Sequence, residues 1–283
     1  KNLSNERITT LADEYLACMD RIITNDEEWD DAHIRLAIRS KVLCLKSSGR
    51  NREAIRIIQD NQHDYDMRIM LIEELIETGD YATAKKLCHR YQQDTRAYSH
   101  HRTQLMQLML RISDLECNPE SKVESRKQFF LYSNDMDDYR ELKSFCPSEL
   151  WNKCIEEIEA VLIKDRMRLH ILAQVYRENA EYSKLLQLLS KNIGLSELHL
   201  RFGSDAAKAD MDKFLDLYQD AIWDAMRDTG REHYEYVARH LHNMLDISQD
   251  YKLVNSFVSE LKQVYPSRRA MIEIFNREFS QNH

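Results

Sequence analysis

Glycine and proline are scarce in this sequence, which has five glycines and three prolines among 283 residues. These residues make the tight turns and bulges of sandwiches and barrels, so their scarcity argues against a fold with many strands. No two glycines lie closer than nine positions apart. That spacing excludes the phosphate-binding loop, the dinucleotide-binding loop and the nucleophile elbow, together with the enzyme classes built on them.

Paired cysteines and long apolar runs are also missing. The six cysteines form no C-x-x-C pair, and no uncharged apolar run approaches the length of a membrane span or a signal core. The net charge of −8 argues against a dominant phosphate-binding surface, although local basic patches remain open. We expect a cytoplasmic protein with reduced thiols and no membrane partner. Because the sequence does not begin with Met, we expect a piece of a longer protein.

Apolar residues recur with helical spacing along almost the whole chain. The runs over residues 8–19 and 34–45 both keep the i, i+3, i+4, i+7 spacing of one buried stripe. Ser/Thr-x-x-Glu sequences beginning at Thr24, Ser121 and Thr229 predict three helix starts. We expect an all-α protein of about 13 or 14 helices, the last within residues 267–279.

A short corner pattern recurs where one predicted helix ends and the next begins. A left-handed residue stops the first helix, and a small residue on the second, such as Ala54 or Ala84, lets the backbones approach. Residues 79–84 resemble the corner of a tetratricopeptide repeat. We therefore expect an α-solenoid, a right-handed superhelix of degenerate tetratricopeptide-like hairpins. The corners contain Gly49, Gly79, Asn179 and Gly230.

The spacing of these corners is irregular, so we expect one continuous solenoid in two parts. A helical-repeat array covers residues 1–193, and a sub-array with a C-terminal capping helix covers residues 194–283. Residues 192–204, with Gly194 and Gly203, are the expected bend between them.

Histidines and cysteines offer weak candidates for a metal site. His33 with the His63-Asp64 pair has the residue types of an all-helical metal phosphohydrolase, but about one His-Asp pair is expected by chance. A capping or surface role explains that pair more simply. Two further sets lack ligand spacing and favour packed or solvent-facing roles. They are His233, His240 and His242, and Cys88, His89, His100 and His101. We assign no metal, cofactor or catalytic residue to this chain.

A flexible apolar stripe runs along the helix predicted near residue 105. A place in the core is the favoured interpretation, and a groove for a protein partner is the alternative. The stripe comprises Leu105, Met106, Met109 and Leu110.

Two charge patterns suggest docking surfaces. Between residues 33 and 56, seven cations and one carboxylate give a local charge of +6, and we select Arg35, Arg39, Lys46 and Arg50 as the candidate docking residues. An acidic row recurs every four residues along a predicted helix, where like charges oppose helix formation unless a basic partner or solvent offsets them. The row comprises Asp212, Asp216, Asp220, Asp224 and Asp228.

The C-terminal sequence resembles the helical tail that follows the zinc-binding module in SWIM zinc finger proteins. The resemblance rests on about the last 50 residues, namely Tyr236-Val-Ala238-x-x-Leu241-x-x-Met244, Phe257-x-x-x-Leu261 and Tyr265-Pro266-Ser-Arg268-Arg269-Ala270-Met271. The family's C-x-C and C-x-H zinc motif is absent, so no metal ligand is carried over. The resemblance implies the C-terminal part of a longer protein that associates with protein or nucleic acid.

The sequence favours a non-enzymatic helical-repeat scaffold that binds a protein partner. Nucleic-acid binding through the basic patch is the alternative, and a metal phosphohydrolase using His33, His63 and Asp64 is a third, less favoured one. The oligomeric state is left open.

Overall fold

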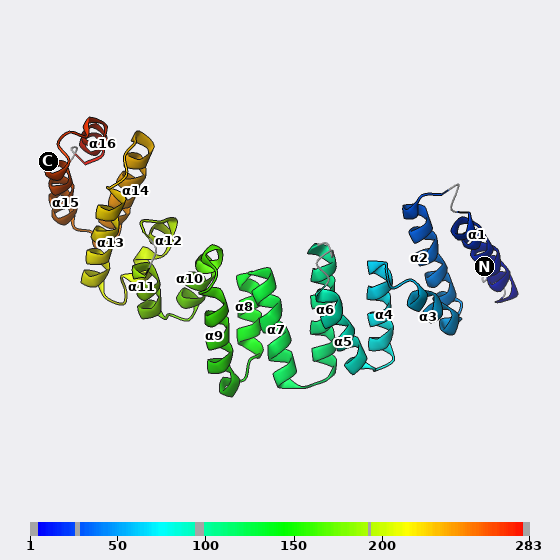
Figure 1. The fold of residues 1–283 in the computed structure, drawn as a ribbon. Coiled ribbons are helices and arrows are strands. Elements are labelled where there is room, and N and C mark those ends of the chain that lie inside the picture. Colours follow the sequence, from blue (N-terminus) through cyan, green and yellow to red (C-terminus); the bar gives the residue numbers. More distant parts are fainter. Residues whose placement is uncertain (1–4, 26–28, 94–98, 192–193, 280–283) are drawn as a thin grey trace. The chain divides into compact units, whose positions relative to one another are not determined.

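The computed structural model describes residues 5–25, 29–93, 99–191 and 194–279, and every regular element in these ranges is helical (Figure 1). The prediction of an all-α protein is confirmed. Sixteen α-helices lie in the described residues, more than predicted, because several predicted long helices are divided by tight turns. No helix in these ranges is long and apolar enough to cross a bilayer.

The chain divides into two compact units. Unit 1 comprises residues 1–133 and 141–151, and unit 2 comprises residues 134–140 and 152–283. Unit 1 contains α1 (Asn5–Thr24), α2 (Asp31–Ser47), α3 (Asn51–Asp60), α4 (Tyr65–Glu77), α5 (Tyr81–Gln92), α6 (Ser99–Leu115) and α7 (Pro119–Ser133). Helices α8 (Met136–Phe145) and α9 (Ser148–Leu162) contribute residues to both units.

Unit 2 continues from α9 to the last described helix. It contains the 3₁₀ helix η1 (Arg166–Arg168), α10 (Leu169–Glu178), α11 (Tyr182–Ser190), α12 (Glu197–Ala206), α13 (Met211–Ala225), α14 (Arg231–Ser248), α15 (Tyr251–Val264) and α16 (Arg269–Phe279). The compact units do not divide at the predicted boundary between residues 193 and 194. Helices α11 and α12, on either side of it, pack together, and residues 192–193 lie outside the described residues.

Helices pack mainly on their neighbours in chain order. Within unit 1, α1 to α7 include the successive contacts α1–α2, α2–α3, α3–α4, α4–α5, α5–α6 and α6–α7, and α4 also contacts α6. Within unit 2, α10 contacts α12, α12 contacts α14 and α14 contacts α16. Each helix therefore buries its apolar stripe against elements one or two positions away in the sequence, as stacked hairpins do.

The cores follow the predicted apolar stripes. In unit 1, one cluster includes Val42, Leu45 and Ile58, and the next includes Ile72 and Ile112. In unit 2, the fully buried side chains are larger and include Phe202, Phe214, Tyr218 and Phe275. Burial of such side chains contributes about 1.5–3 kcal/mol each, so these stripes supply most of the packing free energy.

Three helical corners share one hydrogen-bond geometry. At the α4–α5 corner, Gly79 has φ of +80°, its amide donates to the Ile76 carbonyl at 3.2 Å, and the amide of Asp80 donates to the Leu75 carbonyl at 2.8 Å. The same pair of bonds closes α2 around Gly49 and α10 around Ala180. This is the Schellman arrangement, which satisfies the last carbonyls of a helix. The small residues Ala54 and Ala84 of the following helices are fully buried, as predicted.

Two of the predicted corner residues have other roles. At the α10–α11 corner the left-handed residue is Ala180, with φ of +55°, and Asn179 before it has φ of −93°. Gly230 has φ of +137° and is the N-cap of α14, whereas α13 ends five residues earlier at Ala225. The prediction that Asn179 and Gly230 stop helices in the left-handed conformation is therefore wrong.

The three predicted capping sequences are also misplaced. Thr24 is the last residue of α1, Ser121 lies inside α7, and Gly230 rather than Thr229 is the N-cap of α14. The carboxylate of Asp30 caps α2, and the Asn118 side chain accepts from the backbone amides at the start of α7. In each case the helix begins where another side chain or Gly230 already supplies the cap.

Gly203 belongs to a packed helix and not to a bend. It is buried inside α12, where an added Cβ would meet Phe214 Cζ and Ile247 Cδ1 at 2.9 Å. The glycine allows α12 to approach α13 and α14 closely. The prediction of a bend at this position is wrong because α12 runs through it.

Candidate functional site

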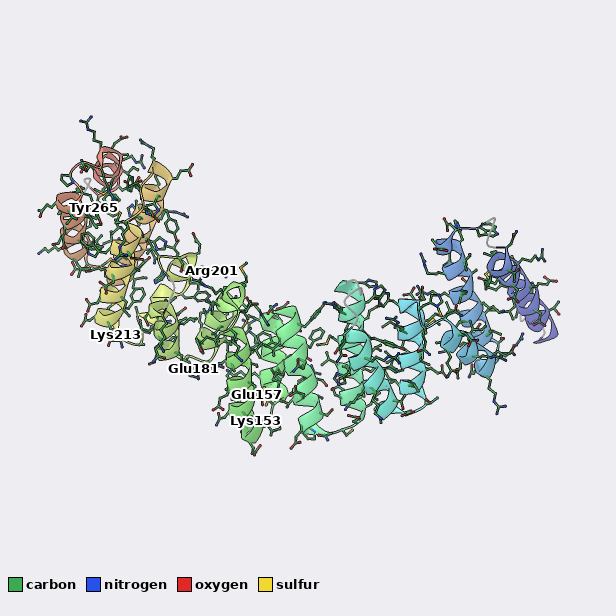
Figure 2. All side chains as sticks on the ribbon, in the orientation of Figure 1. Lys153, Glu157, Glu181, Arg201, Lys213 and Tyr265 are labelled. Atoms are coloured by element: carbon green, nitrogen blue, oxygen red, sulfur yellow. The ribbon has the colours of Figure 1, made fainter. Side chains whose placement is uncertain are left out.

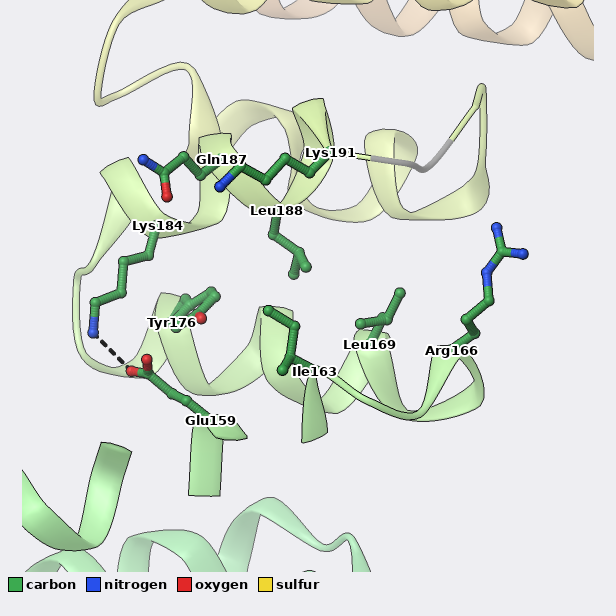
Figure 3. Close-up of a pocket in the computed structure, with 9 residues that line it drawn as sticks. All are labelled: Glu159, Ile163, Arg166, Leu169, Tyr176, Lys184, Gln187, Leu188 and Lys191. Atoms are coloured by element: carbon green, nitrogen blue, oxygen red, sulfur yellow. Dashed lines mark hydrogen bonds and ion pairs between the residues drawn. The ribbon is translucent and has the colours of Figure 1, made fainter. Parts of the chain in front are cut away.

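The most apolar concave feature described in unit 2 is a pocket between α9, η1, α10 and α11, here called the α9–α11 pocket (Figure 3). Its volume is about 450 Å³, within the usual range for ligand sites. It is lined by Glu159, Ile163, Arg166, Leu169, Tyr176, Lys184, Gln187, Leu188 and Lys191.

Helical spacing places the lining side chains on two facing surfaces. On α10, Leu169 and Tyr176 are seven residues apart, and on α11, Leu188 follows Lys184 by four, so each pair shares one helix face. Figure 3 shows Leu188 directed from α11 toward Ile163 and Leu169. Tyr176 and Leu188 are buried, whereas the Ile163 side chain is 55% exposed. The pocket therefore has a covered apolar floor and an uncovered apolar edge.

Exposed apolar surface continues beyond the pocket. Met167, one residue after Arg166, is 82% exposed, and Val161 is also exposed. The turn between α9 and α10 carries these apolar side chains among charged residues, because α9 ends at Leu162 and the chain reverses through η1. Contiguous exposed apolar surface beside a pocket is typical of an interaction site.

The charged side chains of the pocket are unequal in sign. Three cations, Arg166, Lys184 and Lys191, and one carboxylate, Glu159, line it. Lys184 Nζ lies 2.7 Å from Glu159 and 3.0 Å from Glu181. Burial disfavours its charge, but hydrogen bonds to these two carboxylates outweigh burial and raise the pKa of Lys184. The pocket therefore keeps an excess of positive charge when Glu159 is already engaged.

The phenol of Tyr176 stays protonated in this setting. Burial, followed by the negative charge of Glu159, raises the pKa of Tyr176 to about 12. The Lys184 ammonium lies 5.7 Å from the centre of the Tyr176 ring. The floor is therefore uncharged at neutral pH and the charges lie at its edges.

The basic patch predicted in unit 1 is largely neutralised by carboxylates from other helices. Ion pairs join α2 and the turn after it to α1, α3 and α4, which the sequence count could not show. The pairs are Arg35 with Asp64 (3.9 Å), Arg39 with Asp66 (3.0 Å), Lys41 with Asp20, Lys46 with Glu74 (2.6 Å) and Arg50 with Glu53 (2.7 Å) and Asp13 (3.0 Å). No ion pair to Arg52 or Arg56 is found among the described residues. Structural pairing therefore accounts for five of the seven cations.

The acidic row lies on an exposed surface, but only four of its members belong to one helix. Asp212, Asp216, Asp220 and Asp224 are exposed on α13, whereas Asp228 lies beyond the end of that helix. Asp224 pairs with Arg227 at 3.0 Å. Within the described ranges, no cation pairs with the other three carboxylates of α13. The prediction that Asp228 continues the helical row is wrong because α13 ends at Ala225.

The candidate metal ligands of unit 1 have local partners. Asp64 caps α4 and accepts from the amide of Asp66 at 2.8 Å, as the capping interpretation predicted. His33 lies 2.7 Å from Asp30, the cap of α2, and His63 is exposed. Across the part of the chain that the structure describes, no three His, Cys, Asp or Glu side chains are grouped as metal ligands.

The histidines of α14 are engaged separately. His233 bonds the Ala225 carbonyl at 2.7 Å, and His242 lies 3.3 Å from Glu278. His240 is fully buried, and its Nδ1 lies 2.7 Å from the Tyr218 hydroxyl. Asn243 donates to the same hydroxyl, at 3.0 Å. This buried polar network was not predicted, because helical spacing alone does not show which neighbour supplies a hydrogen bond.

The Leu105–Leu110 stripe divides between core and cavity. Leu105 is buried in the unit 1 core. Met106 and Met109 are only partly buried, and they line a second cavity of about 420 Å³ beside Lys85 and His89. Cys88 lies in the core, where burial raises the pKa of its thiol to about 12, so it is not a ready metal ligand.

The corner between α15 and α16 holds the sequence that resembles SWIM proteins. Tyr265 lies there (Figure 2), with its ring 6.2 Å from that of Trp223 and 4.0 Å from the Arg268 guanidinium. Arg268 donates to the carbonyls of Met226 and Asp228. These residues therefore join the last corner to the α13–α14 turn. Compared with protein-family models, curated proteins and solved structures, the chain gives no match.

Proposed function

We propose that this chain is a non-enzymatic scaffold that binds a protein partner in the α9–α11 pocket. The observation that carries the proposal is an apolar pocket with an uncovered edge at Ile163, continued by exposed Met167. Proteins that act as scaffolds bury such surface in their complexes, where apolar side chains seated in pockets supply most of the binding free energy.

The architecture that we propose for this scaffold is an α-solenoid of tetratricopeptide-like hairpins in the cytoplasm. Two features support it. The α2–α3, α4–α5 and α10–α11 corners repeat one hydrogen-bond geometry, and helices two positions apart contact each other within each unit. Repeated hairpins that contact only nearby elements are the basis of solenoids.

The proposal moves the docking site away from the charge patterns. The cations Arg35, Arg39, Lys46 and Arg50 are paired within unit 1, which disfavours the nucleic-acid alternative. The acidic row on α13 remains exposed and is a second surface that a basic partner could use.

Affinity purification tests the docking proposal. The full-length protein is purified from its own cells as wild type, Ile163→Glu and Val264→Glu, and the bound proteins are quantified by mass spectrometry. Ile163 and Val264 are 55% and 54% exposed, so the second variant controls for a charge placed on exposed apolar surface in the same unit. We expect partners that Ile163→Glu loses and Val264→Glu keeps. Identical partner sets in all three samples would remove the pocket from the function.

We also propose, on the C-terminal residues alone, that the chain is part of a SWIM zinc finger protein. The full-length sequence tests this directly. A C-x-C and C-x-H pair upstream of Lys1 supports the assignment, and a full-length protein without such a pair contradicts it.

A further inference from the structure

We infer that the occupant of the α9–α11 pocket is an acidic segment of the partner that carries a bulky apolar side chain. This inference rests on the proposed docking function and specifies the chemistry of the partner. The apolar side chain enters between Ile163, Leu169 and Leu188, and carboxylates beside it face Arg166 and Lys191.

The apolar part of the inference follows from the lining. Ile163, Leu169 and Leu188 converge from the end of α9, from α10 and from α11 (Figure 3), and no polar side chain lies among them in that view. A cavity of about 450 Å³ has room for a leucine or phenylalanine side chain with adjoining backbone. A polar side chain placed there would lose its hydrogen bonds with water without replacement.

The acidic part follows from how the pocket charges are paired. Glu159 and Glu181 both bond Lys184, at 2.7 and 3.0 Å. Arg166 lies at the opposite end of the pocket from Lys184 (Figure 3), and Lys191 is exposed with no carboxylate paired to it in the described residues. Asp165, next to Arg166, uses its carboxylate to cap η1 by accepting from the Met167 amide at 3.0 Å. An acidic ligand is therefore electrostatically complementary to the edge near Arg166 and Lys191.

A peptide segment fits better than a small anionic amphiphile. The apolar surface does not end at the pocket, because Ile163 is half exposed and Met167 is almost fully exposed. A ligand confined to the cavity would leave both in water, whereas a polypeptide that crosses the edge covers them.

A peptide titration tests the inference with the intact chain. The probe is a fluorescein-labelled peptide of about 18 residues, roughly five helical turns, with Leu or Phe at every third or fourth position and Glu at most others. One control peptide replaces each Glu with Lys, and another replaces each Leu and Phe with Ser. Binding is measured by fluorescence anisotropy at low and at physiological salt.

The protein variants separate charge from apolar contact. Arg166→Glu/Lys191→Glu reverses the charge at one edge, and Ile163→Glu alters the apolar edge. Lys153→Glu, at an exposed position near the start of α9 (Figure 2), and Val264→Glu are the matched controls. Circular dichroism checks that each variant keeps its helices.

We expect the Glu peptide to bind the wild type and the Lys and Ser peptides to bind at least about tenfold more weakly. The double charge reversal should weaken the Glu peptide about tenfold and strengthen the Lys peptide, while Lys153→Glu leaves both unchanged. Ile163→Glu should weaken the Glu peptide about tenfold, and Val264→Glu should not.

Three results would overturn the acidic-segment inference: equal binding of the Glu and Lys peptides, loss of binding in the Lys153→Glu control, or displacement of the peptide by dodecanoate at concentrations below the peptide's own Kd. The last result would assign the pocket to a small anionic amphiphile. If the Glu peptide fails to bind while Ile163→Glu still removes partners in the purification, the docking function stands and only the acidic occupant is wrong. If both experiments fail, the docking function fails as well.

Discussion

The ammonium of Lys184 on α11 lies 2.7 Å from the carboxylate of Glu159 on α9, and this ion pair closes one end of the α9–α11 pocket (Figure 3). The pair engages the one carboxylate that lines the pocket. It therefore fixes the spacing of two helices and leaves positive charge at the other end, near Arg166. Both effects follow from one contact between residues 25 positions apart in the sequence.

Removing this contact should change stability only modestly. Lys184→Met keeps the length of the apolar stem and removes the charge. The Lys184 side chain is 43% exposed, so solvent screens the pair and we expect a loss of about 0.5–1 kcal/mol in the free energy of unfolding. Urea denaturation measures the loss, with Lys153→Met as the control for an exposed lysine on α9. A loss no larger than that of the control would show that the pair does not hold α9 to α11.

Unit 2 should become less stable as the pH falls. Burial is the main cause that lowers the pKa of His240 to about 3 and of His199 to about 4, whereas an unfolded histidine titrates near 6.5. Their contribution to stability is complete above about pH 6.5 and is lost as the pH falls toward 4, because the unfolded chain then binds protons that the folded one excludes. We expect a loss of about 1.4 kcal/mol per histidine for each pH unit below that point.

Urea titrations at pH 7.5 and 5.5 measure this pH dependence. His240→Phe should remove about half of the histidine contribution, since one of two buried imidazoles is gone. His170→Gln is the control, because His170 is exposed. Stability that is equal at the two pH values in the wild type would contradict the assignment of neutral, buried imidazoles.

The shared corner geometry predicts opposite effects at two equivalent positions. Gly79 and Ala180 both occupy the left-handed position, with φ of +80° and +55°. Gly79→Ala should destabilise the protein by about 1 kcal/mol, because a side chain is disfavoured in this conformation. Ala180→Gly should stabilise it by about 0.5 kcal/mol, less than the full difference because glycine also increases the entropy of the unfolded chain. Thermal denaturation that moves both variants in the same direction would contradict the equivalence of the corners.

Relief of repulsion on α13 should stabilise unit 2. Asp216 has Asp212 and Asp220 four residues away on either side, and within the described ranges none of the three has a cationic partner. Asp216→Asn should therefore raise the free energy of unfolding by about 0.5 kcal/mol, an effect that salt reduces. Asp224→Asn is the matched control, since Asp224 pairs with Arg227. Equal effects of the two substitutions at low salt would contradict the difference in their environments.

The local features of the fold could be predicted where the signal is local. Apolar spacing identifies the helices, and Gly79 with Ala84 identifies a corner, because each depends on residues within one or two turns. Asn179 misled because the left-handed position falls one residue later, at Ala180, which alanine occupies at an energetic cost. Thr24 misled because a capping sequence does not show whether the preceding helix has already ended.

The site could not be predicted because its residues come from separate helices. Ile163 and Met167 stand among charged residues in the sequence, which is a faint signal of exposed apolar surface, but nothing local pairs them with Leu188. Conversely, the cations from Arg35 to Arg50 look unbalanced in the sequence, whereas carboxylates such as Asp66 and Glu74 on α4 neutralise them in space. Charge counted along a chain therefore overstates the charge of a surface whenever neighbouring helices carry the opposite sign.

Site-specific photocrosslinking tests the docking account most directly. A photoreactive benzoylphenylalanine is placed at Ile163, or at the equally exposed Val264, in the full-length protein within its own cells. The account predicts a covalent adduct with a partner protein from position 163 and none from position 264. No adduct at position 163, or the same adducts at both positions, would contradict a docking site at the α9–α11 pocket.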